Sequence, residues 1–113
     1  MVQGMSYLQL YYNKACTREL EKDIEGNYIY NSNNISSNAI MPLIINLWCK
    51  NNGSHTAYEV SLEQVSSDIV IVLPPLKDKI FSNQVVALPV QINIPKGDTA
   101  KHLITLRFNY DSI

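Results

Sequence analysis

The sequence predicts an all-β fold, built as an antiparallel β-sandwich of about seven strands. Hydrophobic residues alternate with period two along most of the 113-residue chain, turn-forming residues separate the alternating runs, and evidence for helices is thin. With 46% hydrophobic and 17% charged residues, the chain is apolar enough to bury a core without a metal or disulfide. We expect a single domain over residues 1–113, because domains commonly hold about 100–150 residues.

The seven expected strands are the runs in which apolar residues alternate or cluster. They are residues 6–12, 27–30, 42–50, 58–65, 69–73, 84–94 and 102–110. Residues 42–50 are apolar on both faces, which indicates a central strand, and we expect Trp48 there to be buried between the sheets. Residues 58–65 show the pattern of a half-buried strand, with Tyr58 and Val60 on the same face. Pro89 indicates an edge position or a bulge.

Two turns and a polar connection are predicted between these strands. Asn51-Asn-Gly-Ser54 indicates a tight turn, because Asn and Gly accept the positive φ that such turns demand. Residues 95–98 indicate a second turn, and residues 77–79 are expected to form a polar connection. Pro74-Pro75 ends the preceding strand, since proline cannot donate a hydrogen bond to a neighbouring strand.

Residues 17–25 are the one arguable helix, with Leu20 and Ile24 four positions apart. Two apolar anchors are few for a helix of this length. We therefore expect an irregular or short-strand connection, with a single helical turn as the alternative. Residues 31–38 are expected to be a long, flexible loop, and residues 1–5 an N-terminal arm.

No arrangement of residues predicts catalysis, a metal or a cofactor. His55 and His102 lie far apart in sequence, and no Cys or carboxylate is spaced to complete a metal site, so both are expected to be surface imidazoles. No serine lies in a nucleophile elbow, and no glycine pair could cradle a phosphate. The acidic run around Glu19–Glu25 is more typical of a solvated loop than of a calcium site. A small hydrolase that uses an unrecognised carboxylate pair is the lowest-ranked alternative.

Charge and hydropathy exclude further classes. The formal net charge of −1 argues against nucleic-acid binding, because neutralising phosphates requires an excess of Lys and Arg. No apolar run approaches the ~20 residues of a membrane span, and the first residues lack the pattern of a secretory signal. We therefore expect a protein made in the cytosol, with Cys16 and Cys49 as reduced thiols.

The tyrosines suggest a binding surface. Tyr7 and Tyr11 fall on the face opposite Leu8, and Tyr28 and Tyr30 share a face. Tyrosine is large, rigid and amphipathic, which suits contacts with proteins and sugars, although its high β propensity makes ordinary strand filling the alternative. Together with the apolar N-terminal arm, the candidate interface residues are Met1, Val2, Met5, Tyr7, Tyr11, Tyr28 and Tyr30.

Part of the chain resembles immunoglobulin-like (Ig-like) modules. Residues 47–62 contain a strand that ends in Lys-Asn-x-Gly, followed by an Ala-x-x-Val-x-Leu strand, and residues 88–97 and 104–108 resemble the last two strands of such modules. Residues 7–13 and 19–26 are similar to small proteins encoded among bacteriophage structural genes. This resemblance implies an Ig-like antiparallel β-sandwich, of the kind found in free-standing capsid decoration and tail-surface proteins.

Together these observations favour a non-enzymatic structural protein of the virion, such as a capsid decoration protein. It would stabilise the assembled shell by docking on the major capsid protein or another virion protein, and its own copies could associate symmetrically. The alternative is a carbohydrate-binding or adhesion-type Ig-like module, in which an exposed row of Tyr28, Tyr30 and Tyr58 would stack on sugar rings. The strands carry few charges and more apolar surface than one small core requires, which favours a partner surface over an active site.

Overall fold

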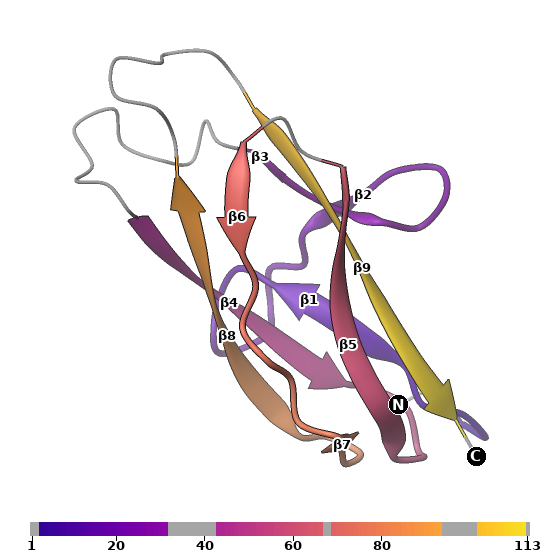
Figure 1. The fold of residues 1–113 in the computed structure, drawn as a ribbon. Helices are drawn as coiled ribbons and strands as arrows, with labels where there is room; N and C mark the ends of the chain where they lie inside the picture. The colour runs from indigo at the N-terminus through magenta and orange to yellow at the C-terminus, as the bar shows by residue number, and fades with distance from the viewer. Residues whose placement is uncertain (1–2, 32–42, 67–68, 94–101, 113) are drawn as a thin grey trace.

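In the computed structural model, residues 3–31, 43–66, 69–93 and 102–112 are described, and they form nine strands and no helix. The strands are β1 (Leu8–Tyr11), β2 (Glu21–Lys22), β3 (Tyr28–Asn31), β4 (Leu43–Asn51), β5 (Ala57–Ser66), β6 (Val70–Val72), β7 (Lys79–Ile80), β8 (Val85–Asn93) and β9 (Leu103–Ser112) (Figure 1). The turn expected at residues 95–98, Met1 and Val2 lie outside the described residues, and so does the loop expected at residues 31–38 except for Asn31, which belongs to β3. The predicted all-β class is confirmed.

The strands form two antiparallel sheets that pack as a sandwich. One sheet has four strands in the order β1-β4-β8-β6, and the other has five strands in the order β2-β3-β9-β5-β7 (Figure 1). Each of the seven predicted runs overlaps one of the strands. The two additional strands, β2 and β7, have two residues each, too few to produce an alternating pattern. The expected short-strand connection at residues 17–25 is confirmed, because this segment contains β2.

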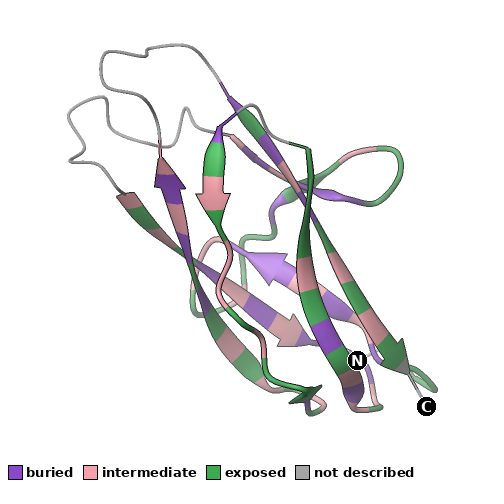
Figure 2. Cartoon of the chain, in the orientation of Figure 1, coloured by how far each residue is buried: buried purple, intermediate pink, exposed green. Residues whose placement is uncertain are grey.

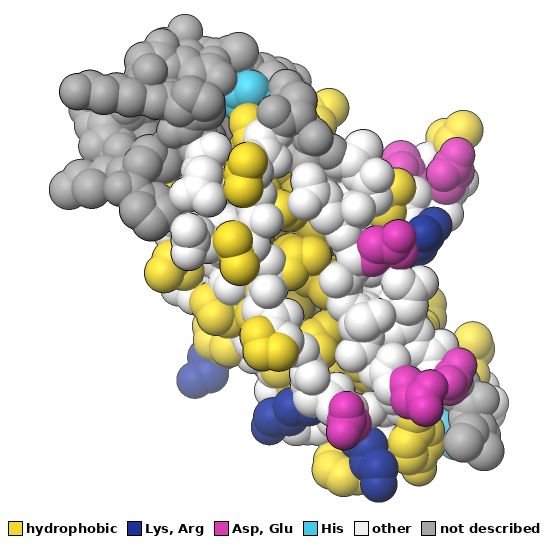
Figure 3. Space-filling model, viewed as in Figure 1, with side chains coloured by type: hydrophobic (Ala, Val, Ile, Leu, Met, Phe, Trp, Pro, Cys, Tyr) yellow, Lys and Arg dark blue, Asp and Glu magenta, His cyan; other side chains and the backbone are white. Residues whose placement is uncertain are grey.

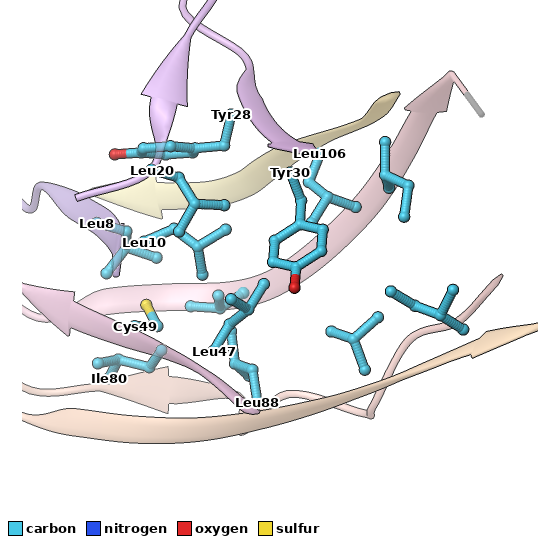
Figure 4. Close-up of a cluster of buried hydrophobic side chains, with 14 of the residues drawn as sticks. Leu8, Leu10, Leu20, Tyr28, Tyr30, Leu47, Cys49, Ile80, Leu88 and Leu106 are labelled. Carbon is cyan, nitrogen blue, oxygen red and sulfur yellow. The ribbon is translucent and has the colours of Figure 1, made fainter. Parts of the chain in front are cut away.

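The core lies between the inner faces of the two sheets. Burial alternates along β4 and β8, where Leu47, Leu88, Val90 and Ile92 are buried and their neighbours are more exposed (Figure 2). In the other sheet, β3 and β9 supply buried side chains to the same cluster (Figure 4). The buried hydrophobic residues are Leu8, Leu10, Tyr11, Leu20, Tyr28, Tyr30, Leu47, Cys49, Ala57, Val60, Ile69, Ile80, Leu88, Val90, Ile92, Ile104 and Leu106.

The four-stranded sheet confirms one prediction about strand position and corrects another. β4 is central, because it pairs with β1 on one side and β8 on the other. Trp48 is half-buried, so its predicted place between the sheets is wrong. It follows Leu47 on β4, whose side chain is buried, and therefore points to the outer face. Pro89 lies beyond the β6 pairing, which covers only residues 91–93, so β8 has a neighbour on one side at this point.

A β-bulge corrects the predicted face of Tyr58. Glu59 adopts φ +50°, and the register between β5 and β9 shifts between Tyr58 and Ser61. The extra residue lets Ala57 and Val60 both point into the core, although they are three positions apart. Tyr58 therefore lies on the outer face, opposite Asp111 of β9.

Asn51 and Gly53 tie the N-terminal segment to one end of the sandwich. The fully buried Asn51 accepts hydrogen bonds from the backbone N–H groups of Tyr7 (3.1 Å) and Gly53 (2.9 Å), and its amide donates to the carbonyls of His55 (2.8 Å) and Ile80 (2.9 Å). Gly53 does not have the positive φ that we expected of this turn. Glycine is needed instead because a Cβ would collide with the backbone of residues 5–7.

Candidate functional site

The imidazoles and thiols do not form a catalytic or metal centre in the described part of the chain. His55 is exposed, but His102 is buried, so its predicted surface position is wrong. His102 precedes β9 and shares the inward face with Ile104. Both thiols are free, and burial raises the pKa of Cys49 to about 12, which disfavours the nucleophilic thiolate. No group of three or more His, Cys, Asp or Glu side chains in the described ranges could hold a metal ion.

A shallow pocket of about 420 Å³ lies where β5, β7 and β9 meet. Tyr58, Glu59, Asp78, Lys79 and Asp111 line it. Glycoside hydrolysis by two carboxyl groups needs one in an apolar, buried environment and the other in a solvated one. All three acidic residues here are exposed, so the pocket lacks that division of roles. The Lys79 ammonium lies 5.7 Å from the centre of the Tyr58 ring and occupies a position from which a sugar would stack.

Two of the predicted interface tyrosines belong to the core. Tyr28 and Tyr30 are only 4% and 5% exposed, so the predicted exposed surface on β3 is wrong, and so is the sugar-binding row that it would share with Tyr58. Tyr30 points into the core cluster (Figure 4) and packs at 5.9 Å from the ring of Tyr12. Tyr28 meets Phe108 edge-on at 6.2 Å. The alternative reading, ordinary strand filling, therefore holds at both positions.

A polar network covers Tyr7 and the hydroxyl of Tyr28. The Lys22 ammonium lies 5.7 Å from the centre of the Tyr7 ring and 4.9 Å from that of Tyr28. Glu19 accepts hydrogen bonds from the Tyr28 hydroxyl (2.8 Å) and the Gln9 amide (2.6 Å) and pairs with Lys22 at 3.5 Å. Burial, followed by the hydrogen bond to Glu19, raises the pKa of Tyr28. These contacts hold β2 against β1 and β3, with Tyr28 buried and Tyr7 half-buried.

The remaining predicted interface residues lie near the N-terminus and on β1. Tyr11 is buried at the outer face of β1, where its hydroxyl donates to Gln9 (3.2 Å) and accepts from Asn52 (2.8 Å). Met5 is exposed, and its carbonyl accepts a hydrogen bond from the His55 backbone N–H at 3.2 Å. Of the predicted set, Met5 therefore presents the most accessible apolar side chain within the described residues.

The outer face of the four-stranded sheet is the candidate that the structure adds. Lys50, at one end, is the only charged residue in the four strands of this sheet. We call this surface the low-charge face. Its outward residues are Gln9, Tyr11, Ile44, Asn46, Trp48, Lys50, Val70, Val72, Val85, Ala87, Pro89, Gln91 and Asn93.

The low-charge face has the composition of a protein interface core. Tyr11, Trp48 and Ala87 lie side by side in one row across β1, β4 and β8, and the four strands of this sheet contain no acidic residue. The Lys14 ammonium lies 5.9 Å from the centre of the Trp48 ring at this surface. Interface cores are depleted in charge and enriched in aromatic residues. In the sequence, this face was signalled by residues 42–50, which are apolar on both faces. We interpreted that pattern as a central strand and did not predict an exposed apolar surface from it.

Comparisons with models of protein families, with curated protein sequences and with solved structures find no significant match to this chain. The described residues also contain no helix that could cross a membrane.

Proposed function

We propose that this protein is a non-enzymatic structural protein that docks on a larger protein assembly through the low-charge face. The observation that carries the proposal is an exposed sheet face whose four strands carry a single charged residue, Lys50, near one end. An antiparallel sheet that faces water on one side normally places polar residues there. Contiguous apolar surface on a soluble domain marks an interaction site more often than an active site.

Docking of this kind needs no catalytic group. A protein that binds only the assembled state stabilises that state by mass action, and many weak copies act together on a repeating surface. The resemblance in residues 7–13 and 19–26 makes a bacteriophage capsid or tail surface the first assembly to test. Attachment would rely on apolar contacts and on amide groups such as Asn46 and Gln91, so its affinity should depend little on salt.

The experiment is a pelleting assay with phage particles purified from the cells that produce this protein. The particles are first stripped of the native protein, then mixed with purified wild-type protein or a variant and sedimented. Ile44→Lys places a charge on the low-charge face, where Ile44 is 58% exposed. The matched control is Leu103→Lys, because Leu103 is 48% exposed on the outer face of the other sheet.

Wild type and Leu103→Lys should pellet with the particles, and Ile44→Lys should stay in the supernatant with at least ~10-fold weaker binding, because a desolvated, unpaired charge opposes docking. Binding should survive at about 0.5 M salt. The proposal is overturned if wild type remains in the supernatant at every concentration. Equal binding by wild type and Ile44→Lys would reject the low-charge face as the docking surface.

A further inference from the structure

Each sheet of a sandwich has edge strands, and exposed edges invite pairing with other chains. In this molecule most edges are protected. Residues 18–20 cover β1, since the Leu20 N–H donates to the Leu10 carbonyl (3.0 Å) and the Tyr12 N–H donates to the Arg18 carbonyl (2.8 Å). β2 and β7 are two residues long and carry charge.

Beyond its short pairing with β7, one edge of β5 has no neighbouring strand among the described residues. Two features of this edge nevertheless oppose pairing with another chain. Glu59 forms a bulge there with φ +50°, and a second register shift follows between Gln64 and Ser66. Bulges twist an edge away from flat pairing, and Glu63 adds a charge to the same stretch. A second strand would therefore meet a distorted and charged edge at β5.

β6 differs from these edges. It lies at the end of the four-stranded sheet and pairs with β8 alone among the strands of the described structure. Its three residues, Val70, Ile71 and Val72, are β-branched and uncharged, and Val70 and Val72 are 67% and 52% exposed. In an antiparallel pair, alternate residues point their N–H and C=O groups away from the partner strand, so part of the β6 backbone faces the open side. Yellow side chains lie over β6 in Figure 3 with no charged side chain beside them.

We propose that β6 pairs with β6 of a second copy of this chain, antiparallel and across a two-fold axis. Val-Ile-Val is self-complementary in that arrangement, with Ile71 opposite the partner's Ile71 and Val70 opposite the partner's Val72. The absence of charge removes the repulsion that a symmetric contact creates when like charges meet. The pair would join two four-stranded sheets into one sheet and place two low-charge faces side by side.

The contact is short, so the dimer is weak in solution and forms mainly where copies are concentrated. Strand β6 has three residues, and Pro74-Pro75 follows it and prevents a longer ladder on that side. A repeating assembly would supply the high local concentration. The inference does not depend on the proposed docking, because purified protein alone can dimerise.

Analytical ultracentrifugation of the purified protein over a concentration series up to about 1 mM tests the inference. The average mass of wild type should rise from 12.8 kDa towards twice that value. The variant carrying both Val70→Lys and Val72→Lys places like charges opposite each other across the two-fold axis, and its dimerisation should be at least ~10-fold weaker. The matched control carries Ile24→Lys and Phe81→Lys, which add the same charge at exposed apolar residues away from β6.

Ile44→Lys separates edge pairing from packing of one low-charge face on another. It should leave dimerisation unchanged, whereas face-to-face packing would be lost. Circular dichroism of each variant confirms folding, and amide exchange at residues 70–72 should slow as the concentration of wild type rises. The inference is overturned if wild type stays at 12.8 kDa throughout, or if the β6 double variant dimerises as strongly as the control pair.

Discussion

The outer face of the four-stranded sheet and the outer face of the five-stranded sheet cover the same core from opposite sides, but they meet solvent differently. Lys50 is the only charged residue in the strands of the first sheet. The strands of the second carry Glu21, Lys22, Glu59, Glu63, Lys79, Arg107 and Asp111. On that charged face, Glu63 accepts hydrogen bonds from Arg107 at 2.9 Å and Asn109 at 3.0 Å.

This difference in charge indicates that only one of the two outer faces is adapted to water. Both sheets bury their inner residues, so folding alone does not require one outer face to be nearly free of charge. An outer face that remains in solvent gains solubility from charge and loses little stability by carrying it. Apart from Lys50 near the end of β4, the strands of the low-charge face carry no charge, which is expected of a surface that a partner covers.

The two outer faces stay on opposite sides of one core only if the two sheets keep a fixed relation, and Asn51 links the two sheets. It ends β4 of the four-stranded sheet and donates a hydrogen bond to the Ile80 carbonyl of β7 in the other sheet. Asn51→Ala leaves buried donors and acceptors unpaired and should lower the free energy of unfolding by about 3 kcal/mol or more. Urea denaturation measures the loss. Asn46→Ala, on the exposed side of the same strand, should change stability by less than about 0.5 kcal/mol. Similar losses in both variants would show that Asn51 does not hold the two sheets together.

The next prediction asks whether the low-charge face contributes to folding. Val90 and Val85 lie on the same strand, β8, but Val90 is buried and Val85 is on the outer face. Val90→Ala should cost about 2–3 kcal/mol of unfolding free energy, because it removes buried methyl groups and leaves a cavity. Val85→Ala should cost less than about 0.5 kcal/mol. Equal losses in urea denaturation would mean that the outer residues are needed for stability, and the case for a partner surface would weaken.

Alternation predicted the strands well because its signal is local. The patterns in β8 and β9 follow period two over nine or more residues, and the same residues face inward in the structure. A bulge breaks the rule without changing composition, which is why Glu59 reversed the predicted face of Tyr58. His102 was misplaced for a different reason: as a polar residue it was assigned to the surface, although the alternation of β9 places it with Ile104.

The candidate site was harder to predict because alternation separates two faces of a strand without saying which one is buried. Tyr28 and Tyr30 do share a face, but that face is the inner one. Trp48 shares one face of β4 with Ile44, and Leu47 lies on the opposite face. Only one of these faces can point into the core, and the buried residue is Leu47. Recognising the low-charge face also requires knowing that β1, β4, β8 and β6 belong to one sheet, and pairing over such sequence distances is not a local property.

The ionic contact between Glu63 and Arg107 is exposed, so we expect it to contribute little to stability. The hydrogen bonds from Asn109 and Arg107 lower the pKa of Glu63 below its ordinary value of 4.5. A depressed folded-state pKa favours folding when the carboxylate is ionised, so this contribution is present above about pH 4.5 and is lost as the pH falls through the folded-state pKa. Glu63→Gln should therefore flatten part of the decline in melting temperature below about pH 4.5, measured by circular dichroism.

Glu21→Gln is the matched control, because Glu21 is an exposed glutamate in a strand of the same sheet. The melting temperature of Glu21→Gln should fall with pH in nearly the same way as that of wild type, whereas the melting temperature of Glu63→Gln should fall less. Added salt should reduce the difference between wild type and Glu63→Gln, since the contact with Arg107 is exposed and screened. If Glu63→Gln and wild type respond to pH and salt alike, the ionic contacts of the charged face do not stabilise the fold, and its charges serve solubility alone.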